Sequence, residues 1–244
     1  MRYKITLSYN GADFCGWQIQ PHDPSVQETL QKALSTLLGG DISLTGAGRT
    51  DTGVHARNYT AHFDYPSEIG TETLIYKLNA ILPPSIAIHS IEKTRDDFHA
   101  RFDARRREYC YYIHRCKDPF ANSFSYYYPY GELDLEAMNR AAALLTGRHD
   151  FSSFEKSGSD NKNPVCTVFE ACWYKEDENH WYFRIAADRF LRNMVRSIVG
   201  TLLEVGRGKR AAESIPELIE SRNRCLAGQS VPGKALFLSK VEYF

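Results

Sequence analysis

The order of alternating and helical hydrophobic segments is the feature that most constrains the fold. Residues 2–9 alternate apolar and polar side chains, which predicts a strand with one buried face. Ser25 and Glu28 form a capping box before a helical stripe that ends at Gly39. After them come a short apolar piece at 42–45, a strand at 58–65, a helix at 74–82 and a strand at 86–91. This half therefore predicts the order βαββαβ.

The second half repeats that order without repeating the sequence. Strands are expected at 109–113, 167–174, 181–185 and 236–243, and helices at 135–145, 189–205 and 211–222. We expect an α+β fold in which two ferredoxin-like (split βαβ) halves share a mostly antiparallel sheet with a central active-site cleft. The predicted domains are residues 1–104, which carry the loop of Asp51, and residues 105–244, which carry the strand of Tyr109 and the helix of Arg196.

Composition narrows the class of protein. Hydrophobic residues make up 43% of the 244 residues, enough to bury a core, and no run of about 18 apolar residues could span a membrane. The N-terminus lacks the apolar stretch of a signal peptide, so we expect a cytoplasmic protein without a membrane anchor. The six cysteines show no zinc spacing. Lys plus Arg equals Asp plus Glu, at 30 each, so any nucleic-acid surface must be local.

The segment from Gly46 to Ala56, GAGRTDTGVHA, places three glycines around the carboxylate of Asp51. It is not a dinucleotide fingerprint, because Asp51 stands where the third glycine is needed, and it lacks the P-loop spacing. Arg49, two residues away, would keep the carboxylate ionised if the two side chains met. His55 lies at i+4 from Asp51, but without a metal or triad pattern it is expected to order the loop. From these residues alone, an ordinary turn is an equally good interpretation.

Three arginine clusters are candidates for a local basic surface, one of them Arg207 and Arg210 beside Lys209. Arg189, Arg192 and Arg196 fall at i, i+3 and i+7 of the predicted 189–205 helix, on an edge beside its apolar face. Arg105, Arg106 and Arg107 form the second cluster. Each cluster, taken alone, is more typical of a solvated charged face.

The 46–56 segment resembles the signature of the tRNA pseudouridine synthase A family, whose catalytic aspartate lies in a G-R-T-D-x-G-V-H-A motif. Further matches follow the order of that family along nearly the whole chain. They are Tyr9-Asn10-Gly11, Gly16-Trp17-Gln18, Val26-Gln27, Asn79, Leu82-Pro83, Phe98-His99-Ala100-Arg101, Tyr109-x-Tyr111, His149-Asp150-Phe151 and Met194-Val195-Arg196.

The resemblance assigns roles to individual residues. It implies that Asp51 is the catalytic carboxylate and that Tyr109 stacks on the target base, as an extracted base requires. It also places Arg196 beside Asp51 as the favoured ion-pair partner and Leu191 in the wall of the uracil pocket. Arg49, the other candidate partner, would otherwise contact phosphate or help to extrude the base. Without the resemblance, Tyr109 and Leu191 would be interpreted as core residues. Low-specificity phosphate contacts are expected from Arg105, Arg106, Arg107 and Arg192.

The same resemblance implies an isomerase that converts uridines at sites 38, 39 and 40 of the tRNA anticodon arm to pseudouridine. It implies no metal, no cofactor and a homodimer. The reaction breaks the N1–C1′ bond, turns the uracil and rejoins it through C5. Whether the aspartate attacks C1′ or removes a C2′ proton stays open.

The chain departs from the family pattern at three places. Thr52 stands where the family often has alanine, Tyr59 where it often has glutamine, and Arg192-Asn193 where histidine is common.

Two other functions compete with this interpretation. A non-catalytic RNA-binding module with paired ferredoxin-like units is the alternative, but it would not need an aspartate facing phosphates. A metabolic enzyme for a small ligand would need a cofactor or metal pattern, which the sequence lacks.

Overall fold

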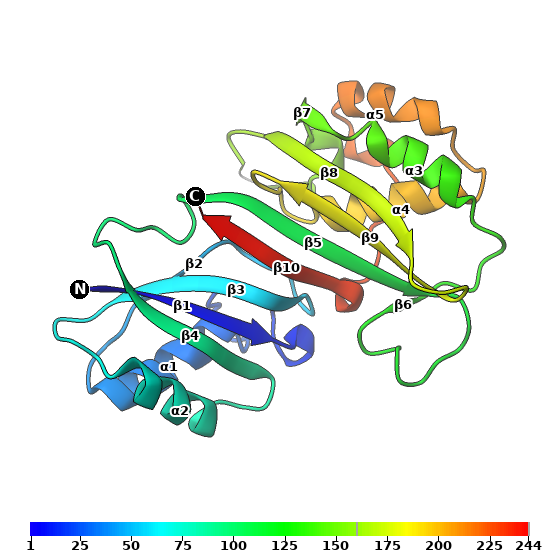
Figure 1. The fold of residues 1–244 in the computed structure, drawn as a ribbon. Coiled ribbons are helices and arrows are strands. Elements are labelled where there is room, and N and C mark those ends of the chain that lie inside the picture. The colour runs from blue at the N-terminus through cyan, green and yellow to red at the C-terminus, as the bar shows by residue number, and fades with distance from the viewer. Residues whose placement is uncertain (160, 244) are drawn as a thin grey trace. The chain divides into compact units, whose positions relative to one another are not determined.

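The computed structural model describes residues 1–159 and 161–243 and shows a mixed α+β fold (Figure 1). Contacts divide the chain into two compact units. The first unit is Met1–Arg105 together with the residues from Phe237 onward, and the second is Arg106–Leu236. No helix among the described residues is long and apolar enough to cross a membrane.

The first unit is a sheet with two helices. Its elements are β1 (Arg2–Tyr9), α1 (Val26–Leu38), β2 (Leu44–Gly46), β3 (His55–Asp64), α2 (Thr71–Ile81), β4 (Ile86–Thr94) and β10 (Leu236–Tyr243). Strand β1 lies between β4 and β3 and is antiparallel to both. The other edge of β3 pairs with β2 at one end and with β10 at the other. The segment that leads into β3 therefore lies at the β10 end, away from β2.

The core of this unit follows from the alternation of its strands. Tyr3, Ile5 and Leu7 of β1 lie opposite Phe63, Ala61 and Tyr59 of β3, and all six side chains are buried. Helices α1 and α2 both lie against the sheet on the same side (Figure 1). The predicted strands and helices of this half are confirmed, with β3 beginning at His55 rather than at residue 58.

Helix α1 begins and ends where the sequence indicates. The Ser25 hydroxyl accepts a hydrogen bond from the amide of Glu28 at 3.2 Å, which satisfies one of the four amides left unpaired in a first helical turn. Gly39 ends the helix in the left-handed conformation, with φ of 74°. Local residues therefore set both ends of this helix.

The second unit is also built from a sheet and helices. Its elements are β5 (Ala104–His114), β6 (Tyr126–Tyr127), α3 (Leu135–Ala143), β7 (Gly147–Asp150), β8 (Val165–Lys175), β9 (His180–Ala187), α4 (Met194–Gly206) and α5 (Ile215–Ser221). The strand order is β5-β9-β8-β7, all antiparallel, with β6 parallel to β5. Helix α3 packs on β8 and on α4. The short strands β6 and β7 were not expected from the sequence.

The predicted helix over 189–205 is wrong at its beginning. Helix α4 begins at Met194, because Asn193 adopts the left-handed conformation with φ of 66°, which a continuous helix does not allow. Arg189 and Arg192 therefore lie in the segment before the helix, and only Arg196 is on it. The predicted row of three guanidinium groups on one helix edge does not exist.

The C-terminal strand differs from its predicted place in a 105–244 domain. From Phe237 onward it groups with the first unit, where Phe237 and Leu238 pair with His55 and Ala56 of β3. The hydroxyl of Tyr243 donates to the carbonyl of Ala100 at 2.7 Å. Alternation predicted the strand, but alternation does not identify which neighbour it pairs with.

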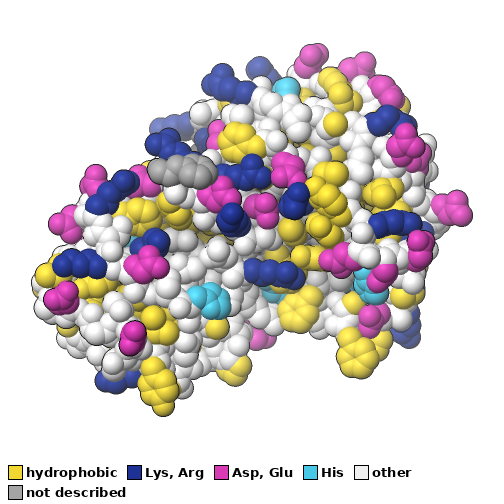
Figure 2. Space-filling model, viewed as in Figure 1, with side chains coloured by type: hydrophobic (Ala, Val, Ile, Leu, Met, Phe, Trp, Pro, Cys, Tyr) yellow, Lys and Arg dark blue, Asp and Glu magenta, His cyan; other side chains and the backbone are white. Residues whose placement is uncertain are grey.

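The surface carries both signs of charge. Figure 2 shows Lys and Arg side chains interspersed with Asp and Glu over the face in view, without a large area of one sign. This agrees with the formal net charge of zero. On this face, no broad basic field would draw the protein to a polyanion.

Candidate active site

The loop that carries Asp51 joins β2 to β3 and is fixed through its backbone. Asp51 is half-buried, and its carbonyl accepts a hydrogen bond from the amide of Val54 at 3.1 Å. Gly53 turns the chain with φ of 74°, and its amide donates to the carbonyl of Phe14 at 3.3 Å. The backbone on the C-terminal side of Asp51 is therefore held by a turn and by a neighbouring segment.

That neighbouring segment approaches the loop so closely that only glycine fits. A Cβ atom on Gly16, which has φ of 90°, would lie 2.2 Å from the carbonyl oxygen of Thr50. A Cβ atom on Gly11 would lie 2.1 Å from the carbonyl oxygen of Val54. Both collisions are with backbone atoms, which cannot swing aside as a side chain can. The two glycines thus set the backbone on either side of Asp51.

Three aromatic side chains, Tyr9, Trp17 and Tyr59, form what we call the aromatic platform of the loop. The rings of Trp17 and Tyr59 stack at 4.1 Å between centroids, and the Tyr9 ring contacts both. All three are buried. The hydroxyl of Tyr9 hydrogen bonds with the hydroxyl of Thr50 at 2.9 Å, and the amide of Trp17 donates to the carbonyl of Thr50 at 3.3 Å.

Tyr59 reaches the same segment three residues before Asp51. Its hydroxyl donates to the carbonyl of Gly48 and accepts a hydrogen bond from the amide of Gly48 at 3.3 Å. A Cβ atom on Gly46 would lie 2.2 Å from that hydroxyl, so the bare glycine leaves room for the ring. The platform therefore holds the chain at Gly48 and at Thr50, on the N-terminal side of Asp51.

Arg49 and His55 take different places beside Asp51. The Arg49 side chain is exposed, and within the described residues it forms no ion pair with Asp51. His55 is buried, its Nδ1 accepts a hydrogen bond from the amide of Gly11 at 3.0 Å, and its ring stacks on Phe237. His55 thus orders the loop, as the sequence indicates, and Arg49 is left to face solvent.

In the second unit, Tyr109 lies on β5 and is half-buried. Its ring meets the ring of Phe190 edge to face, at 5.0 Å between centroids and 85° between planes. Tyr111 is fully buried, as its core interpretation requires, and burial raises its pKa well above the usual value. Its hydroxyl donates to the carbonyl of Pro232 at 2.9 Å.

Arg196 lies in the first turn of α4 and is half-buried. Its Nε donates to the carbonyl of Val231 at 2.7 Å, and the amide of Val231 donates back to the carbonyl of Arg196 at 3.2 Å. We call residues 228–232 the strap, because this segment crosses the N-terminal half of α4. A Cβ atom on Gly200 would lie only 1.9 Å from the carbonyl oxygen of Gln229 in the strap. Leu191 is buried but precedes the helix, so its predicted place in the first turn is wrong.

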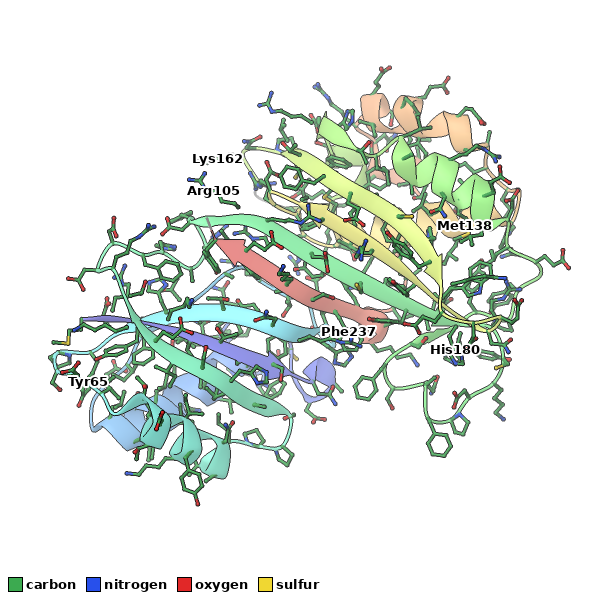
Figure 3. All side chains as sticks on the ribbon, in the orientation of Figure 1. Tyr65, Arg105, Met138, Lys162, His180 and Phe237 are labelled. Carbon is green, nitrogen blue, oxygen red and sulfur yellow. The ribbon has the colours of Figure 1, made fainter. Side chains whose placement is uncertain are left out.

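The remaining arginines differ in what they contact. Arg105 is exposed at the beginning of β5 (Figure 3). Arg106 forms an ion pair with Glu170 at 3.1 Å, and Arg107 donates to the carbonyl of Asp188 at 2.6 Å. Arg192 is exposed. The phosphate contacts of these four arginines stay predictions. For Arg106 and Arg107 the prediction is weaker, because their guanidinium groups already contact other residues of the chain.

The described residues contain no group of three or more His, Cys, Asp or Glu side chains placed to hold a metal ion. The charged groups that the structure brings to the Asp51 loop and to the start of α4 are a carboxylate and guanidinium groups. Such groups can act as nucleophile, base and electrostatic partner.

The sequence did not reveal how the aromatic platform works. Alternation places Tyr9 and Tyr59 on strands. Trp17 carries no signal beyond its place in a family match. The signal that would have found Tyr59 is the coincidence of a glycine at 46 with a bulky residue at 59 on the paired strand, because a small residue is needed where an aromatic hydroxyl reaches a backbone.

Comparison with known proteins identifies the family of the chain. The sequence profile of a family described as tRNA pseudouridine synthase matches residues 5–103 and 141–244. The chain is 51% identical over 244 residues to a protein named tRNA pseudouridine synthase A from Bacteroides thetaiotaomicron, covering 99% of this chain and 90% of that protein. It is 42% identical over 247 residues to one of the same name from Bacillus licheniformis, covering 100% and 99%. The chain belongs to the tRNA pseudouridine synthase family.

Proposed function

We propose that this protein converts uridines of the tRNA anticodon arm, at the family's sites 38, 39 and 40, to pseudouridine, with Asp51 as the catalytic carboxylate. The chain is an isomerase that acts on tRNA uridines. The observation that carries the role of Asp51 is the backbone of its loop, which is held on both sides of one half-buried carboxylate.

The reaction requires a carboxylate that keeps its position while the uracil detaches from C1′, turns and reattaches to it. An ionised Asp51 either attacks C1′ or removes a proton from C2′, and both routes place it at the sugar. A fixed loop backbone lowers the entropic part of the activation barrier, because the carboxylate loses its positional freedom on folding rather than in the transition state.

The proposal gives the second unit the groups that hold the base. Tyr109 stacks on the uracil, and its edge-to-face contact with Phe190 supports a fixed ring orientation. Leu191 lines the pocket. Arg196 is the proposed cation for Asp51, supported by the exposed position of Arg49 without an ion pair to that carboxylate. Arg49 is proposed to contact phosphate.

We also propose that the chain is built from two ferredoxin-like halves sharing a cleft, with domains close to 1–104 and 105–244. The antiparallel order β4-β1-β3-β2, with α1 after β1 and α2 after β3, supports this description of the first half. In the second half, β5-β9-β8 with α3 and α4 follows the same order. This division assigns strand β10 to the second domain, although its residues from Phe237 onward group with the first unit.

The proposed RNA surface extends beyond the reacting nucleotide. Arg105 and Arg192, both exposed, are the better candidates for phosphate contacts, with Arg106 and Arg107 as weaker ones. A homodimer would let two local basic areas serve one tRNA, which suits a chain without net charge. The cytoplasm, where tRNA is processed in bacteria, is the proposed location, and no metal or cofactor is proposed.

The test is pseudouridine formation in unmodified tRNA transcripts, without added metal or cofactor, mapped by sequencing. Wild-type protein should modify the anticodon arm, whereas Asp51→Asn should lose at least about 10³-fold in turnover. Tight tRNA binding should persist in the variant, because the change removes a negative charge near phosphates. RNA binding without product from the wild-type protein would instead support a non-catalytic RNA-binding module, and an active Asp51→Asn variant would remove Asp51 from the mechanism.

A further inference from the structure

The aromatic platform restricts the backbone of the Asp51 loop, which is rich in glycine. Gly46 lets the ring of Tyr59 approach the loop, and Gly53 turns it with a positive φ, but glycine also leaves the backbone more conformations than any other residue does. A carboxylate on such a loop stays in place only if other groups restrict the backbone. The contacts of Gly48 and Thr50 show which groups do so.

The Tyr59 hydroxyl is the central contact. It satisfies both the carbonyl and the amide of Gly48, a residue with no side chain of its own to fix it. The ring is anchored in turn, since it is fully buried on β3 and stacked against Trp17. A rigid strand therefore holds the loop through one hydroxyl group.

Two residues of the platform, Tyr9 and Trp17, also hold Thr50. Tyr9 contacts the side chain of Thr50 and the backbone amide of Trp17 contacts its carbonyl, directly before Asp51. Because the rings pack on one another, a change at one of them is felt at Gly48 and at Thr50 together. The loop segment 48–50 is thus connected to the core of the first unit at both of its ends.

We infer that Tyr59 is a positioning residue for catalysis, whose hydroxyl, within the aromatic platform, fixes the Gly48 peptide groups and thereby holds Asp51 in its reactive place. This inference rests on the proposed catalytic role of Asp51. Tyr59 does not touch the substrate in this account. It acts on kcat by keeping the carboxylate within reach of the sugar.

Tyr3 provides a matched control in the same unit. Its ring is also buried, on β1, and stacks on Phe63. Its hydroxyl also bridges a backbone acceptor and donor, the carbonyl of Ser67 at 3.3 Å and the amide of Ile69 at 3.1 Å. Those residues precede α2 and have no part in the Asp51 loop. Tyr3→Phe and Tyr59→Phe therefore remove equivalent bonds from different places.

The experiment compares steady-state pseudouridine formation and urea unfolding for wild-type protein, Tyr59→Phe, Tyr9→Phe and Tyr3→Phe. The inference expects Tyr59→Phe to lower kcat by about 10- to 100-fold, because misplacing a reacting group by about 1 Å costs that much. Its KM for tRNA should stay within about twofold, because an interaction needed only in the transition state is lost. Tyr9→Phe should lower kcat by a smaller factor, and Tyr3→Phe should leave kcat within about twofold.

Unfolding midpoints separate positioning from simple loss of stability. Tyr59→Phe and Tyr3→Phe should shift the midpoint by similar amounts, while only the former loses kcat. Equal kcat for these two variants, or a Tyr59→Phe defect confined to KM, would overturn the inference. If Tyr59→Phe does not fold, a normal kcat in folded Tyr9→Phe overturns it as well. An inactive wild-type protein or an active Asp51→Asn variant would point to failure of the proposed function instead.

Discussion

The Asp51 loop is held mainly through its backbone, whereas Arg196 is held through its side chain. Gly48, Thr50 and Asp51 are fixed by hydrogen bonds to their peptide groups and by close approach of Gly16. Arg196 sits on a regular helix, and its Nε bonds to the strap carbonyl of Val231. A flexible loop needs its backbone restricted before its short side chain is in place. A long side chain on a rigid helix needs only its far end restricted.

This difference predicts where each region is vulnerable. The loop should be sensitive to any atom added to the glycines that surround it. The start of α4 should be sensitive to loss of the guanidinium group and to disturbance of the strap. Four measurements test this difference.

Removing each candidate cation for Asp51 separates the two regions most clearly. Arg196→Ala should lower turnover by about 100-fold or more, because it removes both the proposed partner of Asp51 and a charged hydrogen bond to Val231. Arg49→Ala should instead raise KM for tRNA and reduce its salt dependence, because its exposed guanidinium faces solvent. Single-turnover rates and salt titrations of both variants measure this. The reverse pattern would make Arg49 the partner.

Adding one methyl group behind the loop tests the backbone restriction. Gly16→Ala should destabilise the protein by about 3 kcal/mol and lower activity at least tenfold, because its Cβ would meet the carbonyl of Thr50. Gly39→Ala is the control, with a similar positive φ of 74° but no atom within 4 Å of the added Cβ. It should cost only about 1–2 kcal/mol and leave activity normal. Urea unfolding and turnover of the two variants decide, and equal effects would mean that the collision has no consequence.

The strap is tested in the same way on the other region. Gly200→Ala should lower the free energy of unfolding by about 2 kcal/mol, because its Cβ would collide with the backbone carbonyl of Gln229, despite a gain in helix propensity of about 1 kcal/mol. Gly206→Ala in the same helix would meet mainly the flexible side chain of Met138 and should cost less. Thermal or urea unfolding measures both. A larger cost at Gly206 would show that the strap yields easily.

The fourth measurement concerns a pH dependence of stability in the first unit, far along β3 from the loop. Burial, reinforced by the Arg2 guanidinium, lowers the pKa of His62 from 6.5 to about 4. The unfolded chain therefore binds more protons between these values, so this contribution to stability is complete above pH 6.5 and is lost as the pH falls towards 4. The loss should be on the order of 2 kcal/mol, and His62→Gln should flatten it.

The control for this pH dependence is His89→Gln on the exposed side of β4, which should keep the wild-type slope. Urea unfolding at several pH values between 4 and 7 provides the measurement. An unchanged slope in His62→Gln would assign the pH dependence to other groups.

The sequence predicted those parts of this protein whose signals are local. Helix α1 needed only Ser25, Glu28 and Gly39, and the strands needed only their alternation, because capping and period two are set by neighbours in the chain. The GRTD segment drew attention to Asp51 for the same reason. The family was also determined by the sequence, since so many ordered matches extend along the chain.

Tertiary structure decided what depends on partners distant in the chain. The Tyr59 hydroxyl meets Gly48 only because β2 and β3 pair, and the strap meets α4 through residues about 30 positions away. The start of α4 differs from its predicted position because Asn193, whose side chain donates to Ser230, takes a left-handed conformation that its apolar neighbours do not indicate. Hydrophobic period records which side chains are buried, but not which polar groups they meet. Those meetings depend on the pairing and packing of whole elements, and so they appear only in the folded chain.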